Sequence, residues 1–311
     1  MEPPDWVHDE VVSLSEFARL IPSHSRRSQT PENKAAALRM ARRRDLAFPE
    51  PRVTRGRGEV FRLGDLVEWA SARGLPVVFE PTWLIVHALR HTASALGSEA
   101  ACLILAAELL RRPVDSEDER RPWEQGTRPP HDRPGVADRS PADRLAATVE
   151  FAIEGGARPS ELLEAALEDV GPHASPKPAS TPRGLAELLV AVGDPHPGEL
   201  VEDPAIGQGE IAMAAARHAG GAVTITGGDV DPNAAFIAAA RLQLAGVPFE
   251  ADTGAQDALA SESEHEGRAD VVLLDPPFGP DMLPWVQVAL RRAKTGGRAV
   301  VVLPMSALEP D

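Results

Sequence analysis

The chain has 311 residues, enough for two or three domains, and 43% of them are hydrophobic, which excludes a wholly disordered protein. Its single cysteine, Cys102, excludes an intramolecular disulfide and indicates a reducing, cytoplasmic compartment, and neither a signal peptide nor a membrane-spanning apolar run is expected. The net charge of −15 by itself argues against nucleic-acid binding. The charge is unevenly distributed, however, because residues 24–57 hold ten arginines and lysines against three acids.

A first domain is predicted over residues 1–80. It is expected to contain a helix over Pro31–Arg44, a tight turn at Gly56 and Gly58 between two short strands, and a closing helix over Asp65–Arg73. This order resembles a winged helix-turn-helix of the kind found in excisionases, which presents one helix to the major groove of DNA. The resemblance implies that the helix over Pro31–Arg44 reads DNA and that arginines of the wing contact phosphates.

The basic residues of this domain have two interpretations. A solvated arginine-rich surface without a partner is the simpler one. The resemblance instead makes DNA the partner, with Lys34, Arg39, Arg42, Arg43, Arg44, Arg55 and Arg57 as the predicted DNA-binding residues.

Residues 81–180 are predicted to form a helical region with two linkers. An Ala- and Leu-rich stretch over 83–111 and a pair of helices over 142–170 provide the helices. Between them, residues 112–142 are charged, rich in proline and without hydrophobic period, which is typical of a disordered linker. A second, short linker is predicted from Gly171 to Ser180.

Residues 181–311 alternate between helices and apolar strands, which is typical of an α/β domain with a parallel sheet covered on both faces. The predicted elements are, in order, helix 183–192, strand 199–203, helix 209–219, strand 222–228, helix 232–244, strand 247–251, strand 269–274, helix 281–293 and strand 297–303.

The first strand of this domain leads straight into a turn that contains glycines. Gly207 and Gly209 would let the backbone turn tightly and approach a ligand, although a plain strand-to-helix turn is the alternative. Asp203 at the tip of the strand would repel a pyrophosphate and suits a ligand ammonium, so a zwitterionic adenosyl ligand is favoured over a dinucleotide. Asp229 after the second strand is expected to bind a ribose diol, and Asp257 after the third to accept the adenine amino group.

The stretch Asp-Pro-Ala-Ile-Gly-Gln-Gly-Glu over 203–210, together with Asp-Pro-Pro-Phe over 275–278, resembles the S-adenosylmethionine-dependent DNA amino-methyltransferases. The modification subunits of type I restriction systems are the most similar group. The resemblance covers residues 181–304 and implies a Rossmann-like methyltransferase domain with S-adenosylmethionine as cofactor and no metal. It also implies that Thr181 and Ala205 join the cofactor-binding residues, while a helix N-cap is the alternative for Thr181.

The Asp-Pro-Pro-Phe motif is expected to bind the reacting nucleobase. The Asp275 carboxylate and the Pro276 carbonyl can accept the two N–H bonds of an exocyclic amino group, and the rings of Pro276 and Pro277 fix these acceptors in place. Phe278 can stack on a base rotated out of the duplex. The alternative is that the prolines only end a core strand and that Phe278 packs in the core.

These motifs favour an adenine-specific DNA methyltransferase, with a specificity or restriction subunit, or a chain that completes the sheet, as further candidate partners. The sequence ends soon after the fifth predicted strand, whereas the family continues with an antiparallel hairpin, so a truncated sheet is expected. Two other interpretations stay open. One is a non-catalytic DNA-binding regulator that retains the methyltransferase-like domain, and the other is a methyltransferase that acts on RNA or on a protein amide.

Overall fold

The computed structural model describes residues 5–22, 30–45, 47–53, 59–112, 140–174, 181–255, 257–260, 266–279 and 282–305. Contacts group the chain into two compact units. The first unit comprises the described parts of Met1–Thr92 and Arg121–Ala157, and the second those of Ala93–Arg120 and Arg158–Asp311. The domain boundaries at residues 80 and 180 stay a prediction, and most of the predicted linker over 112–142 lies outside the described residues.

The first unit combines helices with short antiparallel strands that pair in the order β1-β3-β2. Some of its helices begin at capping side chains: the Ser13 hydroxyl accepts from the Glu16 backbone N–H, and the Thr30 side chain accepts from the Asn33 N–H. The elements are η1 (Asp5–Asp9), β1 (Val11–Val12), α1 (Leu14–Phe17), η2 (Ala18–Leu20), α2 (Pro31–Arg44), β2 (Arg52–Val53), β3 (Glu59–Arg62), α3 (Leu63–Ser71), α4 (Pro81–Leu96) and α6 (Pro141–Glu154). The boundary between the units lies within α4, after Thr92.

The winged helix-turn-helix interpretation of this unit stays a prediction. Helix α2 has the predicted bounds, and α3 begins at Leu63, two residues before the predicted start of the closing helix. The turn at Gly56 and Gly58, which would form the tip of the wing, lies outside the described residues.

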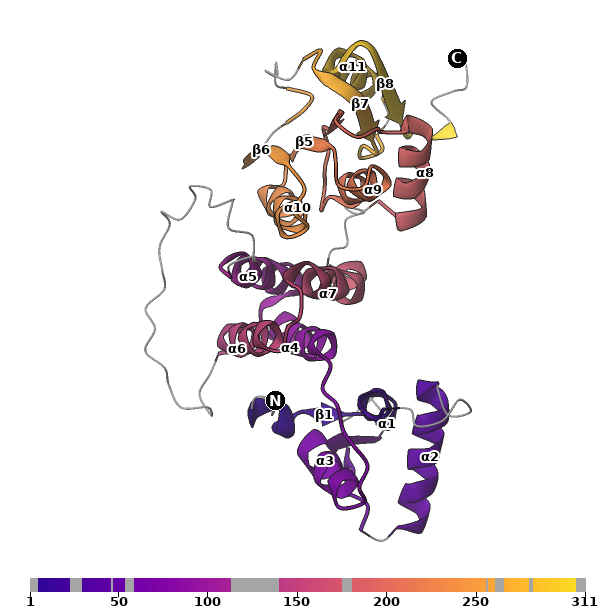
Figure 1. Cartoon of the computed structure of the whole chain (residues 1–311), viewed down its shortest axis with the longest axis vertical. Coiled ribbons are helices and arrows are strands. Elements are labelled where there is room, and N and C mark those ends of the chain that lie inside the picture. The colour runs from indigo at the N-terminus through magenta and orange to yellow at the C-terminus, as the bar shows by residue number, and fades with distance from the viewer. Residues whose placement is uncertain are drawn as a thin grey trace. The chain divides into compact units, whose positions relative to one another are not determined.

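The second unit is an α/β domain with a five-stranded parallel sheet of order β6-β5-β4-β7-β8, which confirms the predicted fold class (Figure 1). None of the described helices in either unit is long and apolar enough to cross a membrane. The elements are α5 (Ser98–Leu110), α7 (Pro159–Ala174), α8 (Arg183–Gly193), β4 (Leu200–Asp203), α9 (Glu210–His218), β5 (Thr224–Asp229), α10 (Pro232–Leu244), β6 (Phe249–Ala255), β7 (Ala269–Leu274), α11 (Leu283–Arg292) and β8 (Ala293–Val301).

Several predicted boundaries are wrong. Strand β6 covers Phe249–Ala255 rather than 247–251. Helix α7 continues to Ala174, so the second linker does not begin at Gly171. The glycine and the following proline lie in the last turn, so the proline interrupts the ladder of hydrogen bonds only close to the end of the helix. Strand β8 begins at Ala293 rather than at residue 297. Ala293 pairs with Ala269, and the pairing then resumes at Arg298, so the residues between them bulge out of the ladder.

The sheet is covered by helices on both faces, which explains why β7 is apolar at successive positions. Val271 and Leu273 pack in a core with residues of α8, α9 and α10. Val272 and Leu274 point the other way and pack with Trp285 of α11 and its neighbours. Because the four residues from Val271 to Leu274 are all buried, this run does not alternate between apolar and polar side chains.

The order of the strands creates a switch point beside β4. The chain runs from β4 to β5 and β6 on one side, then crosses back to β7 and β8 on the other side. The two βα connections that follow β4 and β7 therefore lead away from each other. In open parallel sheets, ligands bind outside the carboxyl ends of the strands at such a point.

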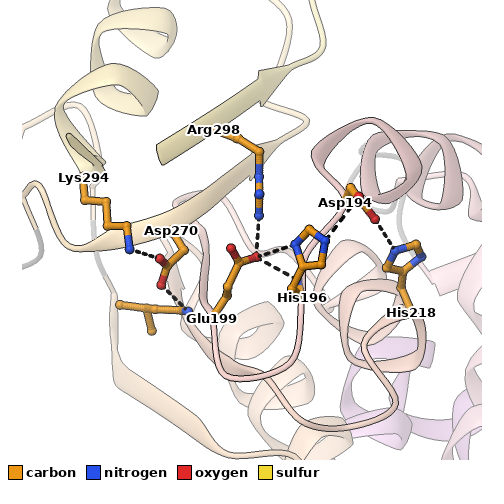
Figure 2. Close-up of polar contacts among 8 residues, drawn as sticks. Asp194, His196, Glu199, His218, Asp270, Lys294 and Arg298 are labelled. Carbon is orange, nitrogen blue, oxygen red and sulfur yellow. Dashed lines mark hydrogen bonds and ion pairs between the residues drawn. The ribbon is translucent and has the colours of Figure 1, made fainter. Parts of the chain in front are cut away.

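Polar contacts connect the strands at the other end of the sheet, near their amino-terminal ends (Figure 2). The Leu200 N–H donates to Asp270 Oδ2 at 2.9 Å, and the other oxygen of Asp270 pairs with Lys294. Glu199 pairs with Arg298. These contacts join the starts of β4, β7 and β8, so they hold the strands in register at the end that lies away from the switch point. The same view also contains Asp194, His196 and His218.

Candidate functional site

The turn after β4 has the tight backbone that its glycines predict. Gly207 and Gly209 have φ angles of 53° and 88°, in the left-handed region that favours glycine. The Gly209 N–H donates to the Ile206 carbonyl at 2.8 Å. A Cβ on Gly209 would lie 3.1 Å from the Ala238 side chain of α10, so the turn rests directly on that helix.

Asp229, at the end of β5, fastens this turn. Its Oδ2 atom accepts the Gly207 N–H at 2.9 Å, and its Oδ1 atom accepts the Asp231 N–H at 2.9 Å. The Ile206 N–H also donates to the Gly228 carbonyl at 3.0 Å. An ionised carboxylate offers about four lone pairs, so Asp229 can bind further donors while it holds the turn.

Asp203 is a buried carboxylate with an unsatisfied atom. The residue is 2% exposed, its Oδ1 atom accepts the Ala205 N–H at 3.2 Å, and its Oδ2 atom has no hydrogen-bond partner among the described residues. Burial raises the pKa of Asp203 well above its ordinary value, and the charges of Asp229 and Asp275 raise it further. A buried carboxylate of this kind is costly unless a donor or cation satisfies it, so the arrangement is typical of a binding site.

The Asp-Pro-Pro-Phe motif follows β7, the strand next to β4. Asp275 is half-buried and close enough to Asp203 to act on its pKa, and Pro276 is buried. Phe278 is 61% exposed, which does not suit the alternative of a core packing residue. The structure therefore brings the glycine turn and the motif to one edge of the sheet.

Two predicted cofactor-binding residues lie at the ends of other elements. Thr181 is half-buried and precedes α8, whose N-cap residue is Pro182, so Thr181 is not the N-cap. Asp257 follows β6, is exposed, and accepts the Leu259 N–H at 2.9 Å. The binding roles of both residues stay a prediction.

The predicted DNA-binding residues divide into three groups. Two of them form contacts within the first unit: Lys34 donates to the Ile21 carbonyl at 2.6 Å, and Arg42 pairs with Glu59 and lies over the Phe61 ring. The exposed residues are Arg39, Arg43 and Arg44, and those outside the described residues are Arg55 and Arg57.

Sequence reasoning missed two ion pairs of the second unit in which the arginine is buried. Arg241 of α10 pairs with Glu164 of α7 and contacts the glycine turn. Arg292 of α11 donates to Glu202 of β4 at 2.7 Å; burial raises the pKa of Glu202 to about 7, although the arginine opposes this. The one available signal was an arginine inside the Ala-rich helix over 232–244, and it is weak in a chain with so many arginines.

Replacing Gly227 by alanine is expected to destabilise the second unit by about 3 kcal/mol, the upper end of overpacking effects. A Cβ at this position of β5 would lie 2.3 Å from the backbone oxygen of Asp203, so β4 and β5 would have to separate. Urea unfolding measures the effect. Gly184→Ala on α8 is the matched control, because nothing lies within 4 Å of its Cβ and alanine favours helices. Equal stability of Gly227→Ala and the wild type would contradict the close approach of the two strands.

Comparison with known families connects this edge of the sheet with methyl transfer. Residues 178–283 match the model of a family described as N-6 DNA Methylase. The matched segment contains both the glycine turn and the Asp-Pro-Pro-Phe motif. The family uses S-adenosylmethionine.

Several solved structures of methyltransferases are similar to the chain. A putative class I S-adenosylmethionine-dependent methyltransferase from Listeria monocytogenes is 19% identical with a TM-score of 0.51, over 74% of this chain and 76% of that one. A modification subunit of a putative type I restriction enzyme from Vibrio vulnificus YJ016 is 23% identical, over 52% of this chain and 43% of that one, with a TM-score of 0.41. A type I methyltransferase subunit from Streptococcus thermophilus is 19% identical, over 55% and 45%, with a TM-score of 0.43.

This chain thus spans less than half the length of the two type I subunits. The likeness to the Listeria protein shows the methyltransferase fold. The segment that matches the N-6 DNA Methylase model, residues 178–283, thus lies within a unit that has the methyltransferase fold.

Proposed function

We propose that the chain is an adenine-specific DNA methyltransferase, or the core of one, that takes its methyl group from S-adenosylmethionine. The observation that carries the proposal is the buried Asp203 carboxylate, whose unsatisfied oxygen lies at the switch point of the sheet beside a glycine turn. Such a site suits a ligand that carries a positively charged group. The family match supports S-adenosylmethionine as that ligand.

The residues around the turn fit this cofactor. Asp203 would pair with the ammonium of the methionine part, and Asp229 has lone pairs left for the ribose hydroxyls. Asp257 would accept the adenine amino group. The proposed cofactor-binding residues are Thr181, Asp203, Ala205, Gly207, Gly209, Asp229 and Asp257.

The Asp-Pro-Pro-Phe tip would hold the amino group that receives the methyl. Its nitrogen lone pair is delocalised into the ring, so the reaction needs acceptors that hold both N–H bonds while the nitrogen becomes tetrahedral. The Asp275 carboxylate and the Pro276 carbonyl are the proposed acceptors, and Pro277 restricts the backbone. The exposure of Phe278 supports stacking on an extruded base.

The first unit is the proposed DNA-binding part, which would act in the cytoplasm together with a specificity or restriction subunit. The exposed arginines of α2 support this role, because phosphate contacts supply most of the non-specific affinity for DNA. Recognition of a particular DNA sequence would need further contacts to base edges.

Calorimetric titration of the full chain with S-adenosylmethionine, followed by incubation with the methyl-labelled cofactor and bacterial DNA, tests the proposal. We expect binding, and label on adenine after digestion of the DNA. Binding without label in DNA would favour the non-catalytic regulator, and label in added RNA or protein would favour the third interpretation. A chain that does not bind the cofactor would reject every enzyme interpretation.

Replacing Arg39, Arg43 and Arg44 together by alanine is expected to weaken DNA binding and to reduce the slope of log affinity against log salt by about 2–3, since each phosphate contact contributes about 0.9. Arg42 is left unchanged because it pairs with Glu59. Affinities measured between low and physiological salt give the slope. Arg217→Ala, an exposed arginine of α9, is the control. A slope equal to that of the wild type would reject α2 as the DNA-binding helix.

A further inference from the structure

A buried arginine of α10 connects the glycine turn to a helix that precedes the family-matched segment. Arg241 is 7% exposed, and its Nη1 atom donates to the Gln208 carbonyl at 2.6 Å, in the middle of the turn. Its Nε and Nη2 atoms donate to the two carboxylate oxygens of Glu164 on α7, at 2.7 and 2.9 Å. Nη1 also contacts Glu210, the first residue of α9, at 3.2 Å. All three guanidinium nitrogens therefore have acceptors.

The geometry of these contacts is specific to arginine. Two parallel N–H bonds to one carboxylate need the planar fork of a guanidinium, and the third nitrogen then points at the Gln208 carbonyl. Burial by itself would lower the pKa of Arg241, but the hydrogen bonds and charges of Glu164 and Glu210 raise it. Two acids thus stabilise the buried charge, and of these only Glu210 directly follows the turn.

Helix α10 lies between the glycine turn and two helices from earlier in the chain, α5 and α7. On one side, Gly209 rests on Ala238. On the other side, α5 and α7 pack against α10 (Figure 1), and Asn233 donates to Glu99 of α5 at 2.7 Å. Glu99 and Glu164 both lie outside residues 178–283. The support of the turn therefore extends beyond the family-matched segment.

We propose that Arg241 is a positioning residue for the Gly207–Gly209 turn, that Glu164 holds it in place, and that α5 and α7 are consequently part of the scaffold of the cofactor site. The proposal deepens the proposed function and rests on it as far as the cofactor is concerned. Without the Glu164 carboxylate, the guanidinium has no bidentate partner to orient it. The carbonyl of Gln208 then loses its donor, and the turn gains freedom that a ligand must remove when it binds.

Amide hydrogen exchange of the ligand-free full chain tests the positioning role directly. In Glu164→Gln and in Arg241→Lys, we expect the peptide that contains Gly207 and Gly209 to exchange at least about tenfold faster than in the wild type, as for the loss of one hydrogen bond to a charged group. The affinity for S-adenosylmethionine should fall by about the same factor. Glu164→Gln is the milder change, because this side chain is 32% exposed, whereas Arg241 is 7% exposed.

Arg292→Met is the matched control, since it also removes a buried arginine from an ion pair of the same unit. It should lower the stability but leave the exchange of the turn and the cofactor affinity within about twofold of the wild type. Unchanged exchange of the turn in Glu164→Gln and Arg241→Lys would overturn the proposal, and so would an equal increase in Arg292→Met. Failure of the wild type to bind the cofactor would reject the proposed function. The exchange data would still test whether Arg241 positions the turn.

Discussion

Replacing Asp275 by alanine is expected to reduce methyl transfer to DNA by about 10²–10³-fold while the affinity for S-adenosylmethionine is kept. The factor is that of removing one preorganised polar group from a transition state. The cofactor should still bind. The charge of Asp275 raises the pKa of Asp203, so its removal favours the ionised Asp203 carboxylate that would pair with the ammonium. Single-turnover transfer and calorimetric titration measure the two effects separately.

Two further variants sharpen this experiment. Asp275→Asn should retain most of the transfer, because an amide oxygen can accept the same N–H bond. Asp270→Asn, at the opposite end of the same strand, should leave transfer per folded molecule unchanged, because its partners are Leu200 and Lys294. If Asp275→Ala transfers methyl groups as fast as the wild type, the assignment of the motif to the nucleobase is wrong.

Replacing Asp203 by asparagine is expected to weaken binding of S-adenosylmethionine by at least about 30-fold, the lower bound for breaking a buried charge pair by truncating one partner. The pH dependence should change as well. Binding needs the ionised carboxylate, and the pKa of Asp203 is raised, so the affinity of the wild type should rise with pH. Asparagine does not titrate, and the variant should lack this dependence. Calorimetric titration at several pH values measures both.

The same substitution should stabilise the ligand-free protein. Because the folded state raises the pKa of Asp203, this residue contributes stability below its unfolded pKa of about 3.9, and the contribution is lost as the pH rises through the folded value. An asparagine in place of the acid would avoid the cost of a buried charge, so the stability of Asp203→Asn should fall less than that of the wild type as the pH rises. Urea unfolding over the acidic to neutral range measures it.

Glu202→Gln is the control for Asp203→Asn, since Glu202 is the preceding residue, is also buried, and pairs with Arg292. It should keep the cofactor affinity within about twofold. An Asp203→Asn variant that binds the cofactor as tightly as the wild type would show that the ammonium is bound elsewhere. Lower stability of this variant at neutral pH would show that the carboxylate is satisfied in the ligand-free protein.

Much of the fold could be predicted, because its signals are local. Helix α10 and strand β7 have the bounds predicted from the sequence, 232–244 and 269–274. Asp231 caps the former through the Asn233 N–H, followed by a proline at the first position, and an unbroken apolar run marks the latter. Predicted boundaries were wrong where pairing between strands distant in the sequence sets the end of an element. Ala293, for example, belongs to β8 only because it pairs with Ala269.

By itself, the sequence determined the type and order of the elements in the second unit and the motifs at the tips of β4, β5 and β7, since capping, apolar runs and glycine turns act over a few residues. Only the tertiary structure decided that β4 lies between β5 and β7, so that Asp203, Asp229 and Asp275 meet and the first of them is buried without a full set of partners. It also decided that Arg241 meets Glu164, 77 residues away. No local pattern encodes such a pair, because burial and charge pairing depend on which surfaces the folded chain brings together.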